Sequence, residues 1–302
     1  MGIVERTFNN GEVIIKEGDD GSTFFQLIEG TANVFADYGK KEQFRLAVLE
    51  EGEYFGEMAI IETYPRSATV VANSKVKVIE IPGNELKTYF DENPDMIIAL
   101  MKHLGSRLSA MTKDYNEAKD LLDELRESDS NKKGSLFSKI KKHINMYQTN
   151  KAVFTAMSAE SVCEAFESIT DEGTGDIKSF GSREIIFNEG ANEACLYILR
   201  NGKVGIYKNY GERTQQKISE LSPVSFFGEL GMLTDEPRDT TAVAEAEETY
   251  VEAVYEDYLD TIIHSCPIKI DMLLKHLSFR LRQTNYDFLK VCKEITETYD
   301  NK

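Results

Sequence analysis

Two short stretches of this chain each place a glutamate and an arginine nine residues apart. The first holds Glu57 and Arg66, and the second holds Glu229 and Arg238 (66 − 57 and 238 − 229). A carboxylate accepts a hydrogen bond from a hydroxyl group, and a planar guanidinium donates paired hydrogen bonds to phosphate oxygens. The pair therefore predicts a site for a small anionic ligand that carries a phosphate and a sugar hydroxyl. Its occurrence twice in one register makes the pattern specific.

Each motif lies within a longer internal repeat. Positions match at an offset of 172, as between Phe8 and Phe180, and near residue 83 the offset becomes 173. Self-similarity of this kind indicates two homologous units, each of about a hundred residues. The predicted domains are residues 1–128 and 172–302, joined by a linker of residues 129–171 that belongs to neither repeat.

Within each unit, short apolar segments with frequent glycine turns come before one long helical segment. Many short strands separated by such turns favour a rolled antiparallel architecture. We therefore predict an α+β protein with two antiparallel, jelly-roll-like β-rolls, each followed by a long helix, and a helical linker between them. The strands are expected at 24–28, 31–36, 46–49 and 67–81 in the first unit, and at 184–187, 195–199, 203–207, 216–221 and 240–254 in the second.

The long helices carry an apolar seam spaced four and three residues apart, which is typical of helix-to-helix packing. The first helix is expected from Pro94 to about Glu127. We predict a monomer in which the two seams pair internally as a pseudo-twofold. A homodimer and packing of each helix on its own roll are the alternatives. The facing residues would be Leu104, Leu108, Met111 and Leu122 on one helix and Leu277, Leu281, Phe288 and Ile295 on the other.

The composition argues against nucleic acid as a partner and against a membrane or secreted location. The 302 residues are 29% charged and carry a formal net charge of −17, which disfavours nucleic acid as a partner. There is no apolar run near the ~18–20 residues of a membrane span and no secretory signal at the start, so a cytoplasmic location is expected. The four cysteines show no metal-ligand or redox spacing and are expected to be free buried thiols: Cys163, Cys195, Cys266 and Cys292.

The first motif reads Phe55-Gly56-Glu57-Met58-Ala59-Ile60-Ile61, followed by Pro65-Arg66-Ser67-Ala68-Thr69-Val70. It resembles, at every position, the phosphate-binding cassette of cyclic-nucleotide-binding domains in protein kinase A regulatory subunits and bacterial catabolite-activator-type regulators. The resemblance covers residues 8–115 and 180–288. It implies a β-roll with flanking helices and no catalysis.

By the same resemblance, Glu57 binds the ribose 2′-hydroxyl and Arg66 the cyclic phosphate. The ligand would be cyclic AMP or cyclic GMP, with cyclic AMP favoured because Arg-Ser-Ala also occurs in cyclic-AMP receptors. No other cofactor and no metal is expected. The first predicted site comprises Phe55, Gly56, Glu57, Met58, Ala59, Arg66, Ser67 and Ala68, and the second comprises Phe227, Gly228, Glu229, Leu230, Gly231, Arg238, Asp239 and Thr240.

The second motif departs from the cassette at two positions. Gly231 replaces the small alanine, and Asp239 follows the arginine directly. A carboxylate there could repel a phosphate or divert Arg238 into an internal ion pair. The second site is therefore expected either to bind ligand more weakly or to be degenerate.

These features predict a cyclic-nucleotide sensor that signals to an unidentified protein partner through helix rearrangement. The resemblance includes no helix-turn-helix and no kinase domain. The first alternative is an interaction scaffold with degenerate pockets. The second is a cupin-like metalloenzyme, which is disfavoured because His103, His143, His264 and His276 lie outside the expected strands.

Overall fold

The computed structural model describes residues 2–36, 38–40, 43–56, 66, 68–85, 89, 92–127, 139–148 and 176–300. They divide into two compact units, each of which is described by itself. One unit holds the first roll and the C-terminal parts of both long helices, from Ala110 and from Ser278. The other holds the second roll and their N-terminal parts, up to Ser109 and Leu277. The predicted domain boundaries stay a prediction.

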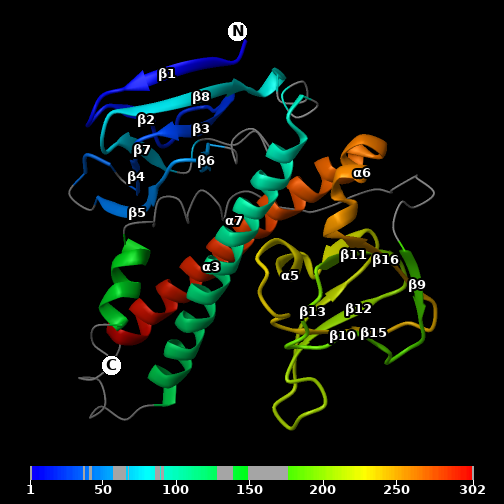
Figure 1. Cartoon of the computed structure of the whole chain (residues 1–302). Helices are drawn as coiled ribbons and strands as arrows, with labels where there is room; N and C mark the ends of the chain where they lie inside the picture. The colour runs from blue at the N-terminus through cyan, green and yellow to red at the C-terminus, as the bar shows by residue number, and fades with distance from the viewer. Residues whose placement is uncertain are drawn as a thin grey trace. The chain divides into compact units, whose positions relative to one another are not determined.

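The first roll is built from two four-stranded antiparallel sheets (Figure 1). Their strand orders are β1-β8-β3-β6 and β2-β7-β4-β5. Phe25 and Leu27 of β3 point into a shared core with Val76 and Val78 of β8, which is the alternation expected of strands with one buried face. The strands are β1 Val4–Phe8, β2 Val13–Ile15, β3 Thr23–Glu29, β4 Ala32–Ala36, β5 Phe44–Leu49, β6 Tyr54–Phe55, β7 Thr69–Ala72 and β8 Val76–Pro82, followed by η1 Gly83–Glu85.

The second roll repeats this topology strand for strand. Its sheets have the orders β14-β11-β16-β9 and β10-β15-β12-β13, which correspond to those of the first roll when each strand is shifted by eight. The predicted pair of antiparallel rolls is confirmed. The elements are β9 Asp176–Phe180, β10 Ile185–Phe187, β11 Cys195–Asn201, β12 Val204–Lys208, β13 Gln216–Leu221, β14 Ser225–Phe227, α5 Glu229–Leu233, β15 Thr241–Ala244, β16 Thr249–Tyr255, η2 Glu256–Tyr258 and α6 Leu259–Ser265.

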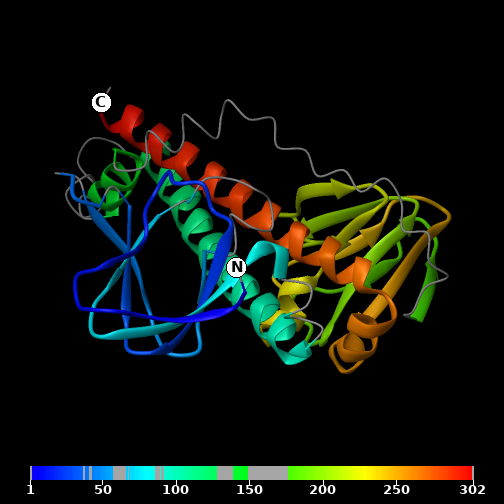
Figure 2. The same ribbon diagram turned by 90° about the horizontal axis from the view of Figure 1, so that it is seen from above.

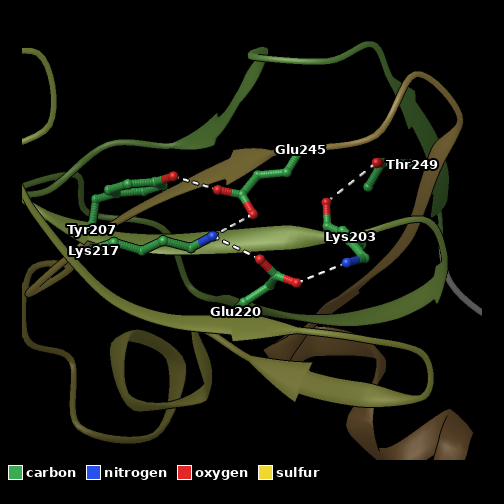
Figure 3. Close-up of polar contacts among 6 residues, drawn as sticks. All are labelled: Lys203, Tyr207, Lys217, Glu220, Glu245 and Thr249. Atoms are coloured by element: carbon green, nitrogen blue, oxygen red, sulfur yellow. Dashed lines mark hydrogen bonds and ion pairs between the residues drawn. The ribbon is translucent and has the colours of Figure 1, made fainter.

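A polar network joins the strands of one sheet in the second roll (Figure 3). Lys217 on β13 donates to Glu220 at 2.8 Å and to Glu245 at 2.7 Å. Lys203 donates to the other oxygen of Glu220 at 2.9 Å, and Tyr207 on β12 donates to Glu245. The hydrogen bonds from Lys217 and Lys203 lower the pKa of Glu220 to about 2, so its carboxylate stays charged. Such cross-strand pairs reinforce the register of β12 and β13.

Two helices of 34 residues each, α3 (Pro94–Glu127) and α7 (Pro267–Asp300), carry the predicted seams. Within the first unit their C-terminal parts run side by side in the same direction (Figures 1 and 2) and share one apolar core. Arg126 donates to Glu294 at 2.8 Å beside that core. The core includes Ala118, Leu121, Leu122, Leu125, Phe288, Leu289, Val291, Cys292 and Ile295, with Met111 and Tyr115 packed against it.

Part of the predicted helix pairing is therefore observed. Leu122, Phe288 and Ile295 share the core, with Met111 at its edge. The remaining seam residues Leu104, Leu108, Leu277 and Leu281 are buried. Of the predicted helical linker, residues 139–148 are helical, and the rest lies outside the described residues.

Within the second unit, the N-terminal part of α3 passes close to α5. A Cβ added to Gly105 would lie 2.7 Å from the Cβ of Leu233, so no larger residue fits at this point of the helix. Ser109 then donates to Glu236 at 2.8 Å, and Lys102 pairs with Glu256 at 2.6 Å. Gly105 is the only glycine of α3. This close packing explains its presence despite a cost of about 1 kcal/mol relative to alanine in a helix interior.

A buried ionic cluster fixes the start of α7 on the second roll. Glu252 of β16 is fully buried and accepts a hydrogen bond from Lys269 of α7 at 2.7 Å. Arg200 of β11 donates to its other oxygen through Nε at 2.8 Å. Burial alone would raise the pKa of Glu252, but the hydrogen bonds from Lys269 and Arg200 outweigh it and leave the pKa below its ordinary value. The carboxylate therefore stays ionised between two cations.

Cys195, Cys266 and Cys292 are buried and form no disulfide, as predicted, while Cys163 lies outside the described residues. Among the helices that the structure describes, none is long and apolar enough to cross a membrane.

Candidate ligand-binding sites

Arg66, the predicted phosphate-binding residue of the first site, is buried and anchored to two backbone carbonyls. Its Nη1 donates to the carbonyl of Gly56 at 2.6 Å, and its Nη2 donates to the carbonyl of Thr23. The backbone of Arg66 also pairs with the preceding loop, donating to Asp19 at 2.9 Å and accepting from Gly18 at 2.9 Å. The arginine therefore ties the cassette to the start of β3 and to the β2–β3 loop.

Gly56 is required at this position. Its φ is +78°, in the left-handed region, and an added Cβ would lie 2.5 Å from Nη1 of Arg66. Phe55 is buried and stacks on Phe25 with ring centroids 5.2 Å apart, and Ala68 is half-buried. Of the predicted first site, Glu57, Met58, Ala59 and Ser67 lie outside the described residues.

Arg238 repeats the geometry of Arg66 in the second site. Its Nη1 donates to the carbonyl of Gly228, and its Nη2 donates to that of Cys195 at 2.6 Å. Gly228, with φ +73°, and Cys195 stand 172 positions after Gly56 and Thr23 (228 − 56 and 195 − 23). The backbone of Arg238 likewise donates to Ala191 and accepts from Gly190, each at 2.8 Å.

The predicted ribose-binding residue of the second site is fully buried. Glu229 begins α5, directly after Gly228, and its Oε1 lies 3.9 Å from Nε2 of His276 on α7. His276 is itself 4% exposed and its ring lies 5.5 Å from that of Phe226. The carboxylate predicted to take a sugar hydroxyl is thus in contact with the long helix that follows the roll.

Sequence reasoning missed His276. The signal was present, because Lys275-His276-Leu277 repeats Lys102-His103-Leu104 at an offset of 173. A histidine kept in both copies at the point where the helix leaves the roll could have been assigned to the site.

The two departures in the second motif have separate structural outcomes. Gly231 leaves space for the arginine, since an added Cβ would lie 2.8 Å from Nη1 of Arg238. Asp239 is exposed, and its Oδ1 accepts from the hydroxyl of Thr240 at 3.3 Å. An internal ion pair does form at Arg238, but its carboxylate is Glu193, 3.7 Å away. The effect of Asp239 on ligand binding stays a prediction.

Aromatic rings enclose the second arginine. The Cζ of Arg238 lies 4.5 Å from the ring centroid of Phe187 and 5.7 Å from that of Tyr197. These rings and that of Phe227 stack on one another with centroids 5.4–6.1 Å apart. Burial, followed by the neighbouring Cys195 and Glu193, raises the pKa of Tyr197, so its phenol remains a hydrogen-bond donor. Of the other predicted residues of the second site, Leu230 and Thr240 are half-buried.

Each of the two antiparallel β-rolls holds a buried arginine that donates to the carbonyl of a glycine with positive φ. In the second roll, a glutamate follows this glycine and begins a short helix. The family model of the cyclic nucleotide-binding domain matches residues 5–93 and 177–265. The chain belongs to the cyclic nucleotide-binding domain family.

Two similar proteins are a regulatory subunit of a protein kinase and a protein kinase. The chain is 26% identical over 247 residues to a cAMP-dependent protein kinase regulatory subunit of Dictyostelium discoideum, covering 81% of this chain and 61% of that protein. It is 26% identical over 237 residues to a cGMP-dependent protein kinase of Plasmodium berghei, covering 78% of this chain and 21% of that protein. The chain thus spans less than two thirds of the length of these relatives.

Among solved structures, the cAMP-bound regulatory subunit described as PfPKA-R (141-441) is 19% identical, with a TM-score of 0.35 over 91% of this chain and 81% of that one. The regulatory domain of Toxoplasma gondii PKA with cAMP is 18% identical, with a TM-score of 0.28 over 87% and 82% of the two chains. The assignment to the family rests on the family match rather than on these scores.

Proposed function

We propose that this chain is a cyclic-nucleotide sensor without catalytic activity of its own, which binds cyclic AMP in preference to cyclic GMP and acts in the cytoplasm. One observation carries the proposal. Arg66 and Arg238 are buried and held by equivalent carbonyls in both rolls, inside the two segments that match the family. A buried guanidinium preorganised in this way suits a phosphate, because a charge-assisted hydrogen bond is strongest where water is excluded.

We further propose that a bound ligand signals to a protein partner through the long helices. In the second roll, Glu229 lies against His276 of α7. A ribose hydroxyl at Glu229 would compete for the same carboxylate and so change the contact between roll and helix. Differential contact of this kind is what a ligand needs to shift a conformational equilibrium.

Replacing Glu57 with alanine tests the assignment of the first site. We expect this change to weaken binding of cyclic AMP more than binding of the 2′-deoxy analogue, because the analogue lacks the hydroxyl that donates a hydrogen bond to the carboxylate. Calorimetric titration of both ligands measures the two losses. Glu51→Ala, which removes an exposed carboxylate from the preceding turn, is the matched control. Equal losses for the two ligands would contradict the ribose assignment.

We also propose that the chain is a monomer whose two long helices pair internally. The shared core of Leu122, Phe288 and Ile295 supports this within one chain. Sedimentation equilibrium at tens of micromolar is expected to give a mass near 34.2 kDa. A stable species of 68.4 kDa (2 × 34.2) would instead favour the homodimer.

A further inference from the structure

Arg66 and Arg238 donate to equivalent backbone carbonyls, but the repeat positions around them differ in charge. Oε2 of Glu193 lies 3.7 Å from Nη2 of Arg238. The equivalent position in the first roll is Gly21 (193 − 172), which has no side chain. Glu193 therefore places a carboxylate beside Arg238 at a repeat position where the first roll has a glycine.

Glu193 is held in place by a second residue that the first roll lacks. The hydroxyl of Tyr197 donates to Oε2 of Glu193 at 3.1 Å. The Tyr197 ring is fixed by stacking on Phe187 and Phe227. Position 25 of the first roll, which corresponds to Tyr197, is Phe25 and has no hydroxyl (197 − 172). Both parts of the arrangement are thus specific to the second copy.

The partly exposed carboxylate of Glu193 lies on the solvent side of the buried Arg238 guanidinium. The Arg238 side chain is 2% exposed, whereas that of Glu193 is 42% exposed. A partly exposed carboxylate can therefore approach or leave while the arginine stays fixed by its carbonyls. Nε of Arg238 is buried and has no hydrogen-bond partner among the described residues.

We propose that Glu193 is an internal counter-ion for Arg238 that competes with the phosphate of a cyclic nucleotide and so lowers the affinity of the second site. Tyr197 is the positioning residue that keeps Glu193 within reach. Two anions beside one guanidinium repel each other, so a phosphate binds at the expense of the contact with Glu193. This inference rests on the proposed function, because it presumes that cyclic nucleotides bind this cassette.

The test uses the full chain carrying Glu57→Ala and Arg66→Ala, so that calorimetric titration with cyclic AMP reports the second site. Adding Glu193→Gln, an isosteric change at a partly exposed position, is expected to tighten binding about two- to fivefold, the range of a half-exposed ion pair. Glu193→Ala should act in the same direction. Tyr197→Phe should give a smaller gain, and none once Glu193 is already glutamine, because the two residues act as a unit.

Asp239→Asn is the matched control, since it removes the same formal charge from the neighbouring exposed carboxylate. The proposal fails if Glu193→Gln leaves affinity unchanged or lowers it, or if Asp239→Asn produces an equal gain. The proposal also fails if no variant binds cyclic AMP at the second site although the first site of the wild type binds it. That outcome would leave the proposed function intact. Absence of binding at both sites of the wild type would overturn the proposed function and this inference together.

Discussion

Arg66→Ala in the full chain is expected to weaken cyclic AMP binding at the first site by roughly 10- to 150-fold, the value of a charge-assisted hydrogen bond of about 1.5–3 kcal/mol. The structure adds a second consequence. Arg66 also donates to the carbonyls of Gly56 and Thr23, so alanine leaves these acceptors without their donor and should lower the melting temperature. Calorimetric titration and thermal unfolding measure the two effects.

Two further variants separate charge from geometry. Arg66→Lys keeps the charge but lacks the planar fork, so it should recover only part of the affinity. Arg45→Ala removes an exposed positive charge from β5 and should leave binding unchanged. If Arg66→Ala bound cyclic AMP as tightly as the wild type at the first site, Arg66 would not be the phosphate ligand.

Glu252→Gln is expected to lower the free energy of unfolding of the second roll by about 3–5 kcal/mol, because it breaks a buried ion pair and leaves Lys269 and Arg200 without their carboxylate. Lys269 is 2% exposed and Glu252 is fully buried, so water cannot replace the lost contact. Urea unfolding followed by circular dichroism measures the change. Asp271→Asn, which breaks the exposed pair with Lys275 on the same helix, is the control and should cost less than about 1 kcal/mol.

The same cluster makes the stability of the folded protein depend on pH in a predictable direction. The pKa of Glu252 is depressed in the folded protein, so its contribution to stability is present above the unfolded value of about 4.3. It is lost as the pH falls through the lower folded pKa. The wild type should therefore lose stability over this acid range more steeply than Glu252→Gln. Equal pH profiles, or equal losses for Glu252→Gln and Asp271→Asn, would contradict the role of the cluster.

The repeated features of the fold could be read from the sequence. The offset of 172 brings Glu57 onto Glu229 and Arg66 onto Arg238, and it relates the strands of the two rolls except β8 and β16, which start 173 residues apart. The helix expected from Pro94 to about Glu127 is observed with those bounds. Local periodicity and breakers determine these elements, so a single sequence is enough to place them.

Contacts between distant residues could not be read in the same way. The cluster of Glu252 joins two strands and a helix, and nothing local marks Arg200 or Lys269 as its partners. The glutamate is the only charged residue in strand β16, which was the available hint that a buried charge would need cations. For Arg238, the sequence drew attention to the adjacent Asp239, whereas the structure pairs it with Glu193 from the loop before β11. Only the comparison with Gly21 at the same repeat position would have pointed there.

If both cassettes bind a cyclic mononucleotide, calorimetric titration of the wild-type chain with cyclic AMP should give saturable heat from two sites per chain. The weaker site should be lost in Arg238→Ala and the tighter one in Arg66→Ala. Cyclic GMP is expected to bind less tightly, and uncyclised adenosine monophosphate serves as the control ligand. A titration that gives no saturable heat with either cyclic nucleotide would exclude the sensor and leave a scaffold with degenerate pockets.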